Sequence, residues 1–318
     1  MRDTRPNQIQ LPAGARAPAA ARLKPERDQR LTLRSVLRQA VAQFKRADLA
    51  FGHGSHNARD EAIYLILHTL KLPLDELDSV LQRRLSADEL EAVQAILLRR
   101  IRERTPAAYL TREAWLGTFR FYVDERAIVP RSFIAELLRR GLAPWIADPS
   151  KLRGVLDLCT GSGCLAVLAA HAFENANVDA ADLSAEALQV ARRNVKNYVL
   201  GKRIRLVQAD LFDRLAARRY DLILSNPPYV NAAAMRALPR EYRREPRLAL
   251  AGGRDGLALV RRMLEQAGAH LNPGGLLVVE IGHNRAVLEK AYPHLPFTWL
   301  ETSAGEDYVF MLHREDLQ

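Results

Sequence analysis

The feature that most constrains the fold is a repeated alternation of short apolar runs and amphipathic segments that begins near residue 133. The apolar runs read VLDLC, ANVDAAD, RIRLVQAD, YDLILS and GLLVVEIG, and most of them are separated by helical segments such as AEALQVARRNVKNYV. Alternation of this kind is typical of a parallel sheet covered by helices on both faces. FTWLE and DYVFMLH near the C-terminus predict two further strands, one of them antiparallel. The pattern therefore predicts an α/β domain over residues 133–318.

The part of the chain before this alternation has a different character. Residues 1–30 are rich in Ala, Pro and Arg without an apolar period, which predicts a disordered basic arm. Over residues 31–110 apolar positions recur three and four apart, as in LTLRSVLRQAVAQF, and SADE at 86–89 has the form of a capping box. Residues 111–132 alternate aromatic and polar positions around a glycine, which predicts a β-hairpin linker. We therefore expect a helical domain that a hairpin joins to the α/β domain.

Composition excludes several classes of protein. Cys159 and Cys164 are the only cysteines in the sequence, which rules out a disulfide framework and a four-cysteine zinc site and predicts a reducing, cytoplasmic setting. His53 and His56 have no carboxylate or cysteine at ligand spacing, so we expect no metal site. No stretch approaches the roughly 20 apolar residues of a membrane helix. The net charge of +10 suggests a polyanionic partner such as RNA, although a generally arginine-rich composition explains it equally well.

A glycine-containing turn and two acids stand where the predicted strands end. DLCTGSGC, residues 157–164, follows the first strand, and its small residues allow a tight turn into the next helix. The same spacing fits a dinucleotide site, so the turn alone does not separate NAD from another adenosine cofactor. Asp182 ends the second strand and suits ribose hydroxyls, while Asp210 and the next amide, that of Leu211, suit an adenine edge. Each acid alone is equally a helix cap, but together they predict a nucleoside pocket.

The fourth strand ends in SNPPYV, residues 225–230. Asn-Pro alone is an ordinary turn signal, and proline must stop the strand because it cannot donate to a ladder. At the same sheet edge as a nucleoside pocket, however, the Asn226 side-chain oxygen and the Pro227 carbonyl can accept the two N–H groups of a planar nitrogen. The ring of Tyr229 offers a face for the substrate plane and for a developing cation. The tetrapeptide thus predicts a site that orients an amide or amino nitrogen.

With DLCTGSGC followed by NPPY, the chain resembles class I S-adenosylmethionine-dependent methyltransferases that modify amide or amino nitrogens. Residues 106–138 and 245–257 are similar to the protein-glutamine methyltransferase family, and the resemblance runs from about residue 31 to the C-terminus. FGHGSHNARDEA, residues 51–62, is similar to the branch that acts on ribosomal protein three of the large subunit. The resemblance implies a Rossmann-like, seven-stranded methyltransferase domain, a helical domain that docks the substrate, and S-adenosylmethionine as cofactor.

The resemblance also implies roles for individual residues. Catalysis is assigned to Asn226, Pro227 and Tyr229, which together with Pro228 hold the glutamine side chain. Cofactor binding is assigned to Asp157, Cys159, Thr160, Gly161, Ser162, Gly163, Asp182, Asp210, Leu211 and Asn226. Cys159 departs from the glycine usual in the family, and its Cβ would crowd the methionine end of the cofactor if φ there is positive.

Five further residues or segments lie outside these assignments, and two of them, Arg131 and Glu136, match family positions without a derived role. For Arg131 and Glu136 we expect a helix-surface ion pair. Glu245 and GGRDG, residues 252–256, are expected to form a loop over the substrate cleft, and Glu280 is expected to pack or bond within the sheet edge.

Methylation of a glutamine in the ribosomal protein, in support of ribosome assembly, is therefore the leading hypothesis, with ribosomal RNA as a further expected contact. Release factors are the alternative protein substrates. The same tetrapeptide also serves adenine-amino methylation of DNA or RNA, but no module that would grip a duplex is apparent. A non-catalytic assembly or RNA-binding factor is a third class, against which the intact Asn226 argues.

Overall fold

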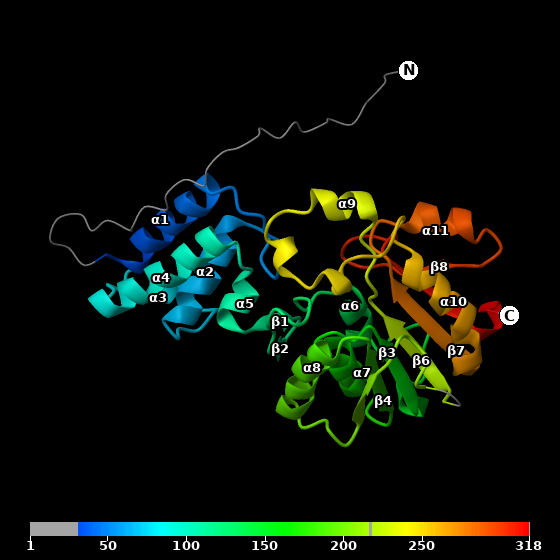
Figure 1. Ribbon diagram of the computed structural model, residues 1–318. Coiled ribbons are helices and arrows are strands. Elements are labelled where there is room, and N and C mark those ends of the chain that lie inside the picture. Colours follow the sequence, from blue (N-terminus) through cyan, green and yellow to red (C-terminus); the bar gives the residue numbers. More distant parts are fainter. Residues whose placement is uncertain (1–30, 216–217, 318) are drawn as a thin grey trace. The chain divides into compact units, whose positions relative to one another are not determined.

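The computed structural model describes residues 31–215 and 218–317, so the predicted basic arm, residues 1–30, lies outside the described residues (Figure 1). The chain divides into two compact units. Among the described residues, the first unit consists of residues 31–49 and Ala58–Arg104. The second unit consists of Ala50–Asn57 and the chain from Thr105 onward. The segment Ala50–Asn57 therefore belongs to the second unit, although its neighbours on both sides in the chain belong to the first.

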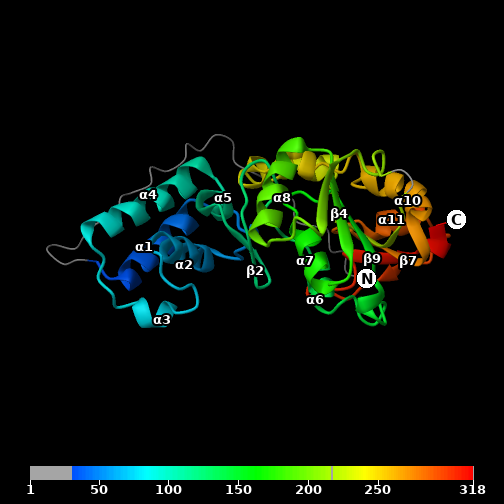
Figure 2. The same cartoon turned by 90° about the horizontal axis from the view of Figure 1, so that it is seen from below.

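The first unit is helical and consists of α1 (Leu33–Arg46), α2 (Ala58–Thr69), α3 (Leu77–Val80) and α4 (Ala87–Glu103). The predicted capping box at the start of α4 is confirmed: the Ser86 hydroxyl accepts from the Glu89 amide, and the Glu89 carboxylate accepts from the Ser86 amide. The helices α1, α2 and α4 lie side by side and bury apolar side chains such as Phe44, Leu65 and Leu97 between them (Figures 1 and 2).

The second unit contains a short hairpin and one large sheet. Its helices are α5 (Ala107–Thr111), α6 (Ile134–Arg139), α7 (Cys164–Ala172), α8 (Ala185–Asn197), α9 (Ala232–Ala237), α10 (Ala258–His270) and α11 (Arg285–Ala291). The hairpin pairs β1 (Ala114–Leu116) with β2 (Phe119–Phe121), and the sheet contains β3 (Gly154–Leu158), β4 (Asn177–Asp182), β5 (Ile204–Gln208), β6 (Tyr220–Ser225), β7 (Leu271–Glu280), β8 (Thr298–Trp299) and β9 (Val309–His313).

The seven-stranded sheet has the order β5-β4-β3-β6-β7-β9-β8, and β9 runs antiparallel to both of its neighbours. This order, together with the single antiparallel strand, confirms the predicted class I methyltransferase fold. Because side chains alternate along a strand, consecutive residues enter different cores. Val155 packs in the core that contains α6 and α7, and Leu156 packs in the core that contains α10 and α11.

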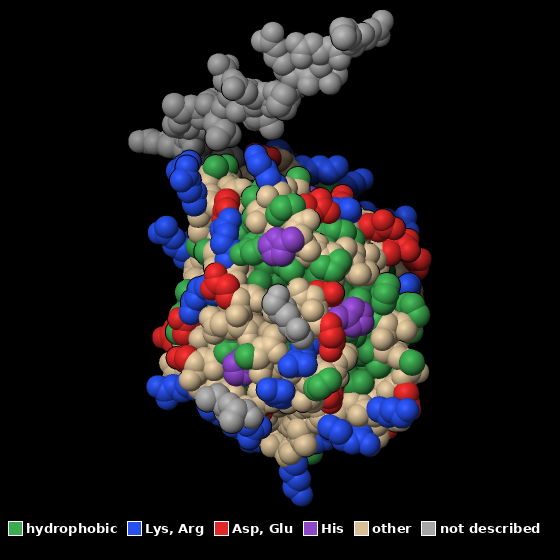
Figure 3. All heavy atoms as spheres, turned by 90° about the vertical axis from the view of Figure 1, so that its right-hand side faces the viewer, with side chains coloured by type: hydrophobic (Ala, Val, Ile, Leu, Met, Phe, Trp, Pro, Cys, Tyr) green, Lys and Arg blue, Asp and Glu red, His purple; other side chains and the backbone are tan. Residues whose placement is uncertain are grey.

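The fold places a binding site at one edge of the sheet. The chain moves from β3 to β4 on one side and returns to β6 on the other side of β3. Loops diverge at such a reversal, so the crevice outside the carboxyl ends of β3, β4 and β6 is the natural ligand position in an open α/β sheet. No helix among the described residues is long and apolar enough to cross a membrane. On the face seen in Figure 3, Lys and Arg side chains are mixed with Asp and Glu rather than segregated.

Candidate active site

The turn between β3 and α7 has an unusual backbone. Cys159 has φ +58°, Gly161 φ +55° and Gly163 φ +77°, all in the left-handed region. A Cβ on Gly163 would lie 3.1 Å from the Cβ of Ala191, so glycine allows this turn to approach α8 closely. The Cys159 side chain was expected to crowd a ligand if φ there is positive, and φ is positive. A left-handed backbone costs a non-glycine residue about 1–2 kcal/mol.

Asp157 is fully buried beneath this turn. Its Oδ2 accepts a hydrogen bond from the Thr160 hydroxyl, while Oδ1 has no hydrogen-bond partner among the residues that the structure describes. Burial raises the pKa of Asp157 to about 7, against the opposing effect of the Thr160 hydrogen bond. The Ser162 carbonyl accepts from Nδ2 of Asn194, a buried residue of α8 that the sequence did not single out. These residues hold the turn in place and do not line the cavity that the turn borders.

A cavity of about 510 Å³ opens in front of the turn and contains Cys159, Gly161 and Asp182 in its lining. Asp182 stands at the end of β4, where Oδ2 accepts from the Gly161 amide and Oδ1 from the Ser184 amide, each at 2.8 Å. These bonds fix the carboxylate, and because a carboxylate has about four acceptor positions, others remain for ligand hydroxyls. Burial raises the pKa of Asp182, and its backbone hydrogen bonds act in the opposite direction.

Asp210 and Leu211 line the same cavity two and three residues after β5. The Asp210 carboxylate forms an ion pair at 3.0 Å with Arg262 of α10, and its amide donates to Asp213. A ligand amino group at Asp210 would therefore share the carboxylate with a guanidinium, a pairing that no local sequence pattern predicts. Leu211 is buried with φ +54° and contributes an apolar wall.

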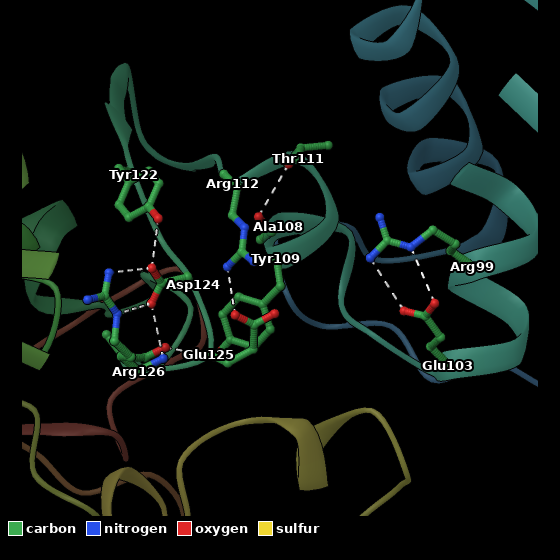
Figure 4. A network of polar contacts seen from close by, with 11 residues as sticks. Arg99, Glu103, Ala108, Tyr109, Thr111, Arg112, Tyr122, Asp124, Glu125 and Arg126 are labelled. Atoms are coloured by element: carbon green, nitrogen blue, oxygen red, sulfur yellow. Dashed lines mark hydrogen bonds and ion pairs between the residues drawn. The ribbon is translucent and has the colours of Figure 1, made fainter. Parts of the chain in front are cut away.

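The opposite wall of the cavity comes from the segment that follows the hairpin, where Glu125, Arg126, Ala127 and Ile128 line it. Asp124 organises this segment: it accepts from the Tyr122 hydroxyl at 2.7 Å and, with both oxygens, from the Arg126 guanidinium (Figure 4). Arg126 also donates to Gln189 of α8. Despite burial, these hydrogen bonds lower the pKa of Asp124 to about 2. Sequence reasoning assigned no role to this segment beyond linking two domains.

The residues present fit S-adenosylmethionine. The lining combines acids, among them Glu125, Asp182 and Asp210, with apolar side chains such as Ile128 and Leu211. Acids supply acceptors for ribose hydroxyls and an electrostatic partner for a cation, and apolar walls suit a base plane. Within the described ranges no group of three His, Cys, Asp or Glu side chains could hold a metal ion.

The tetrapeptide 226–229 begins where β6 ends. The Ser225 hydroxyl donates to the Leu158 carbonyl at 2.9 Å and so ties the ends of β6 and β3 together. Asn226 donates from Nδ2 to the Arg131 carbonyl at 3.0 Å. This bond sets the orientation of the side-chain amide and leaves Oδ1 as an acceptor.

Glycines pack closely against the backbone of the tetrapeptide. A Cβ on Gly252 would lie 2.7 Å from the Tyr229 Cα and 2.8 Å from the Pro228 carbonyl oxygen, and one on Gly256 would lie 2.5 Å from the Tyr229 carbonyl oxygen. Asn284 donates to that same carbonyl at 2.9 Å. Residues 252–256, expected to form a loop over the substrate cleft, thus hold the tetrapeptide in place.

A second cavity, of about 410 Å³, lies beside the tetrapeptide. It is lined mainly by aromatic and apolar residues, including Phe133, Pro227, Tyr229, Tyr242 and Tyr308. Asn226, Ile128 and Ala249 line both this cavity and the 510 Å³ cavity. The two cavities therefore meet at Asn226.

Glu280, which was expected to pack or bond within the sheet edge, is packed and hydrogen-bonded at the carboxyl edge of the sheet. It ends β7, an interior strand between β6 and β9, and it is buried. Its Oε2 accepts from the Ser132 hydroxyl and the Phe133 amide, and Oε1 faces the Tyr229 hydroxyl at 3.4 Å. Burial raises the pKa of Glu280 to about 7. Glu280 therefore bonds to Phe133 and Tyr229, two residues that line the aromatic cavity.

The expected ion pair between Arg131 and Glu136 does not form. Arg131 instead makes a two-pronged ion pair with Glu245, at 2.7 Å on each side, and Glu136 accepts from the amide and hydroxyl of Ser303. Both partners, Glu245 and Ser303, lie more than 100 residues away in the chain, which local spacing cannot anticipate.

Comparison with known proteins identifies the family. The family model for the Methyltransferase small domain matches residues 141–240. The chain is 57% identical over 293 residues to the ribosomal protein uL3 glutamine methyltransferase of Burkholderia pseudomallei, covering 90% of this chain and 95% of that protein. The enzyme of the same name from Neisseria gonorrhoeae is 58% identical over 90% of this chain and 95% of its own length, and that from Bradyrhizobium diazoefficiens is 46% identical over 95% and 97%. The chain belongs to the family of ribosomal protein uL3 glutamine methyltransferases.

Proposed function

We propose that this protein transfers the methyl group of S-adenosylmethionine to the side-chain amide nitrogen of a glutamine in ribosomal protein uL3. The observation that carries the proposal is the meeting of two cavities at Asn226. The larger has the acids and apolar walls that a nucleoside needs, and the other has the aromatic lining that a planar amide needs. Family membership supports uL3 as the substrate in place of release factors.

In this proposal Asn226 orients the substrate amide. An amide nitrogen is a poor nucleophile because its lone pair is delocalised into the carbonyl. Asn226 Oδ1 and the Pro227 carbonyl accept its two N–H groups and hold its face toward the larger cavity. The same acceptors favour the positive charge that develops on nitrogen, and the Tyr229 ring offers its face to that charge. The nitrogen can lose its proton to water after transfer, so no general base is required.

S-adenosylmethionine, when bound, supplies an electrophilic sulfonium methyl group. We assign its ribose to Asp182, its adenine to Asp210 and Leu211, and its methionine end to the turn at 159–163. Asp157, Thr160, Ser162 and Gly163 hold that turn in shape.

We further infer that the helical unit and the arginine-rich residues 1–30 take part in docking uL3 and nearby ribosomal RNA, and that the protein acts in the cytoplasm. The net charge of +10 supports an RNA contact, and two free cysteines suit a reducing compartment. Electrostatic RNA binding weakens steeply with salt, so fluorescence anisotropy on a ribosomal RNA fragment across a salt series tests this contact.

A transfer assay with three candidate substrates tests the proposal. The protein is incubated with labelled S-adenosylmethionine and, separately, with uL3, with a release factor and with naked DNA. We expect label on uL3, located on one glutamine by mass spectrometry. Label on the release factor alone would overturn the substrate, and robust label on DNA would overturn the protein-substrate proposal.

A further inference from the structure

His53 is buried in the second unit, although it lies in a segment whose neighbours in the chain belong to the first. Its Nε2 lies 3.3 Å from Oε2 of Glu245, and its ring contacts the Tyr242 ring at a centroid distance of 4.2 Å. Neither ring nitrogen has a hydrogen-bond partner of regular geometry in the part of the chain that the structure describes, so Nε2 meets Glu245 as an ion-pair contact. Burying an imidazole without hydrogen bonds costs free energy, and its contact with the buried Glu245 carboxylate offsets part of that cost.

Glu245 connects His53 to the backbone near the active site. Oε1 accepts from the Val129 amide at 3.0 Å and from Arg131 at 2.7 Å, and Oε2 accepts from the other Arg131 nitrogen and faces His53. Burial opposes ionisation of Glu245, but the charge of Arg131 outweighs it, and His53 adds to that effect, so the pKa falls to about 2. The carboxylate is therefore ionised and held on three sides.

Arg131 carries the connection to Asn226. Its guanidinium is fixed by Glu245, and its carbonyl accepts the Asn226 Nδ2 hydrogen bond at 3.0 Å. Val129, two residues earlier, is fixed by the same carboxylate. The position of the Arg131 carbonyl, and with it the orientation of the Asn226 amide, thus depends on where Glu245 is held.

The loop around His53 is shaped for this contact. Gly52 has φ +127°, and a Cβ there would lie 2.2 Å from the Tyr242 hydroxyl oxygen. Gly54 has φ +102°, and a Cβ there would meet nothing within 4 Å. The Tyr242 hydroxyl faces the Phe51 carbonyl at 3.4 Å. Gly52 therefore permits the close approach that seats His53 between Tyr242 and Glu245.

We propose that His53 is a positioning residue for methyl transfer: by holding Glu245 it fixes the Arg131 carbonyl and so orients the Asn226 amide toward the substrate nitrogen. This rests on the proposed function. It gives the FGHGSH segment, residues 51–56, a role in the active site of the second unit.

The test compares His53→Phe with His56→Phe, a matched control because His56 is an exposed histidine of the same loop. Phenylalanine keeps a ring against Tyr242 and removes the nitrogen that faces Glu245. In single-turnover transfer to uL3, we expect His53→Phe to be slower by about tenfold or more, because small misplacements of a reacting group cost this much. His56→Phe should match the wild type, and His53→Gln, which keeps an N–H donor, should recover much of the rate.

Two further measurements separate positioning from a merely structural role. Affinity for S-adenosylmethionine, measured by calorimetry, should stay within about twofold in all variants, since His53 does not line the larger cavity. In protein labelled with ¹⁵N-asparagine, the Asn226 side-chain NH₂ resonances, assigned with Asn226→Asp, should shift in His53→Phe and not in His56→Phe.

The NMR result does not depend on any substrate. If the wild type fails to methylate uL3, the proposed function fails. If the wild type methylates uL3 but His53→Phe is as fast as His56→Phe, or the Asn226 resonances do not move, the role of His53 is overturned. A parallel loss of rate and of cofactor affinity in His53→Phe also overturns it.

Discussion

Replacing Asn226 by Ala is expected to stop methyl transfer almost completely while leaving the affinity for S-adenosylmethionine nearly unchanged. The change deletes Oδ1, the acceptor assigned to one N–H group of the substrate amide. It also deletes the donor that bonds to the Arg131 carbonyl at 3.0 Å. The Pro227 carbonyl remains, because it belongs to the backbone. One acceptor alone leaves the amide free to rotate about that single hydrogen bond.

The magnitude follows from the charge on the substrate nitrogen. A hydrogen bond to a charged group contributes about 1.5–3 kcal/mol, which corresponds to about 10- to 150-fold in rate. Loss of orientation adds to this, because a reacting atom held out of line is less often in position for attack. We therefore expect the transfer rate to fall about 100-fold or more. The larger cavity loses one lining side chain among many, so cofactor affinity should change by about threefold at most.

The assay is single-turnover transfer of labelled methyl to uL3 at saturating cofactor, together with calorimetric titration of S-adenosylmethionine. Asn226→Asp is the comparison variant, since it keeps an acceptor of the same shape, replaces the donor to the Arg131 carbonyl by a second acceptor and adds a negative charge. Its rate should lie between those of the wild type and Asn226→Ala. Equal losses of rate and of cofactor affinity in Asn226→Ala would falsify the division of roles between the two cavities.

Three further changes test other parts of the site. Asp182→Asn places an NH₂ group where a carboxylate oxygen accepts hydrogen bonds from backbone amides. Cofactor affinity measured by calorimetry should therefore fall about tenfold or more, while the transfer rate at saturating cofactor changes little. Unchanged affinity would contradict the ribose assignment. Gly252→Ala should lower the free energy of unfolding by about 1–3 kcal/mol and slow transfer, because its Cβ would lie 2.7 Å from the Tyr229 Cα. Gly201→Ala is the control, because a Cβ there would meet nothing within 4 Å. Thermal melts and transfer assays should show both effects for Gly252→Ala and neither for Gly201→Ala. The pKa of Glu280 is raised from 4.5 to about 7, so between these pH values the folded protein retains a proton that the unfolded chain loses. The free energy of unfolding therefore falls by at most about 3 kcal/mol as the pH rises from 4.5 to 7. Glu280→Gln should reduce that fall in urea denaturation at pH 5 and pH 7, and identical falls in both proteins would show that Glu280 does not titrate as described.

The sequence by itself determined the layers of the fold and the edge that carries the site. Apolar runs separated by amphipathic segments are local patterns, and local patterns predict strands and helices because side chains alternate with fixed periods. Once the strands are parallel, their carboxyl ends must share one edge. This is why the sequence alone predicts that Asp182, Asp210 and Asn226 lie at one place.

Only the tertiary structure decided how these residues are held. The Arg131–Glu245 ion pair, the contact of His53 with Glu245 and the Asn226 bond to the Arg131 carbonyl each join segments far apart in the chain. The same holds for Arg262 at Asp210. No local periodicity encodes such pairs, because charged and amide side chains satisfy their hydrogen bonds with whatever partner the packed chain brings near. The residues that face the ligand were thus readable in the sequence, and those that set their orientation required the fold.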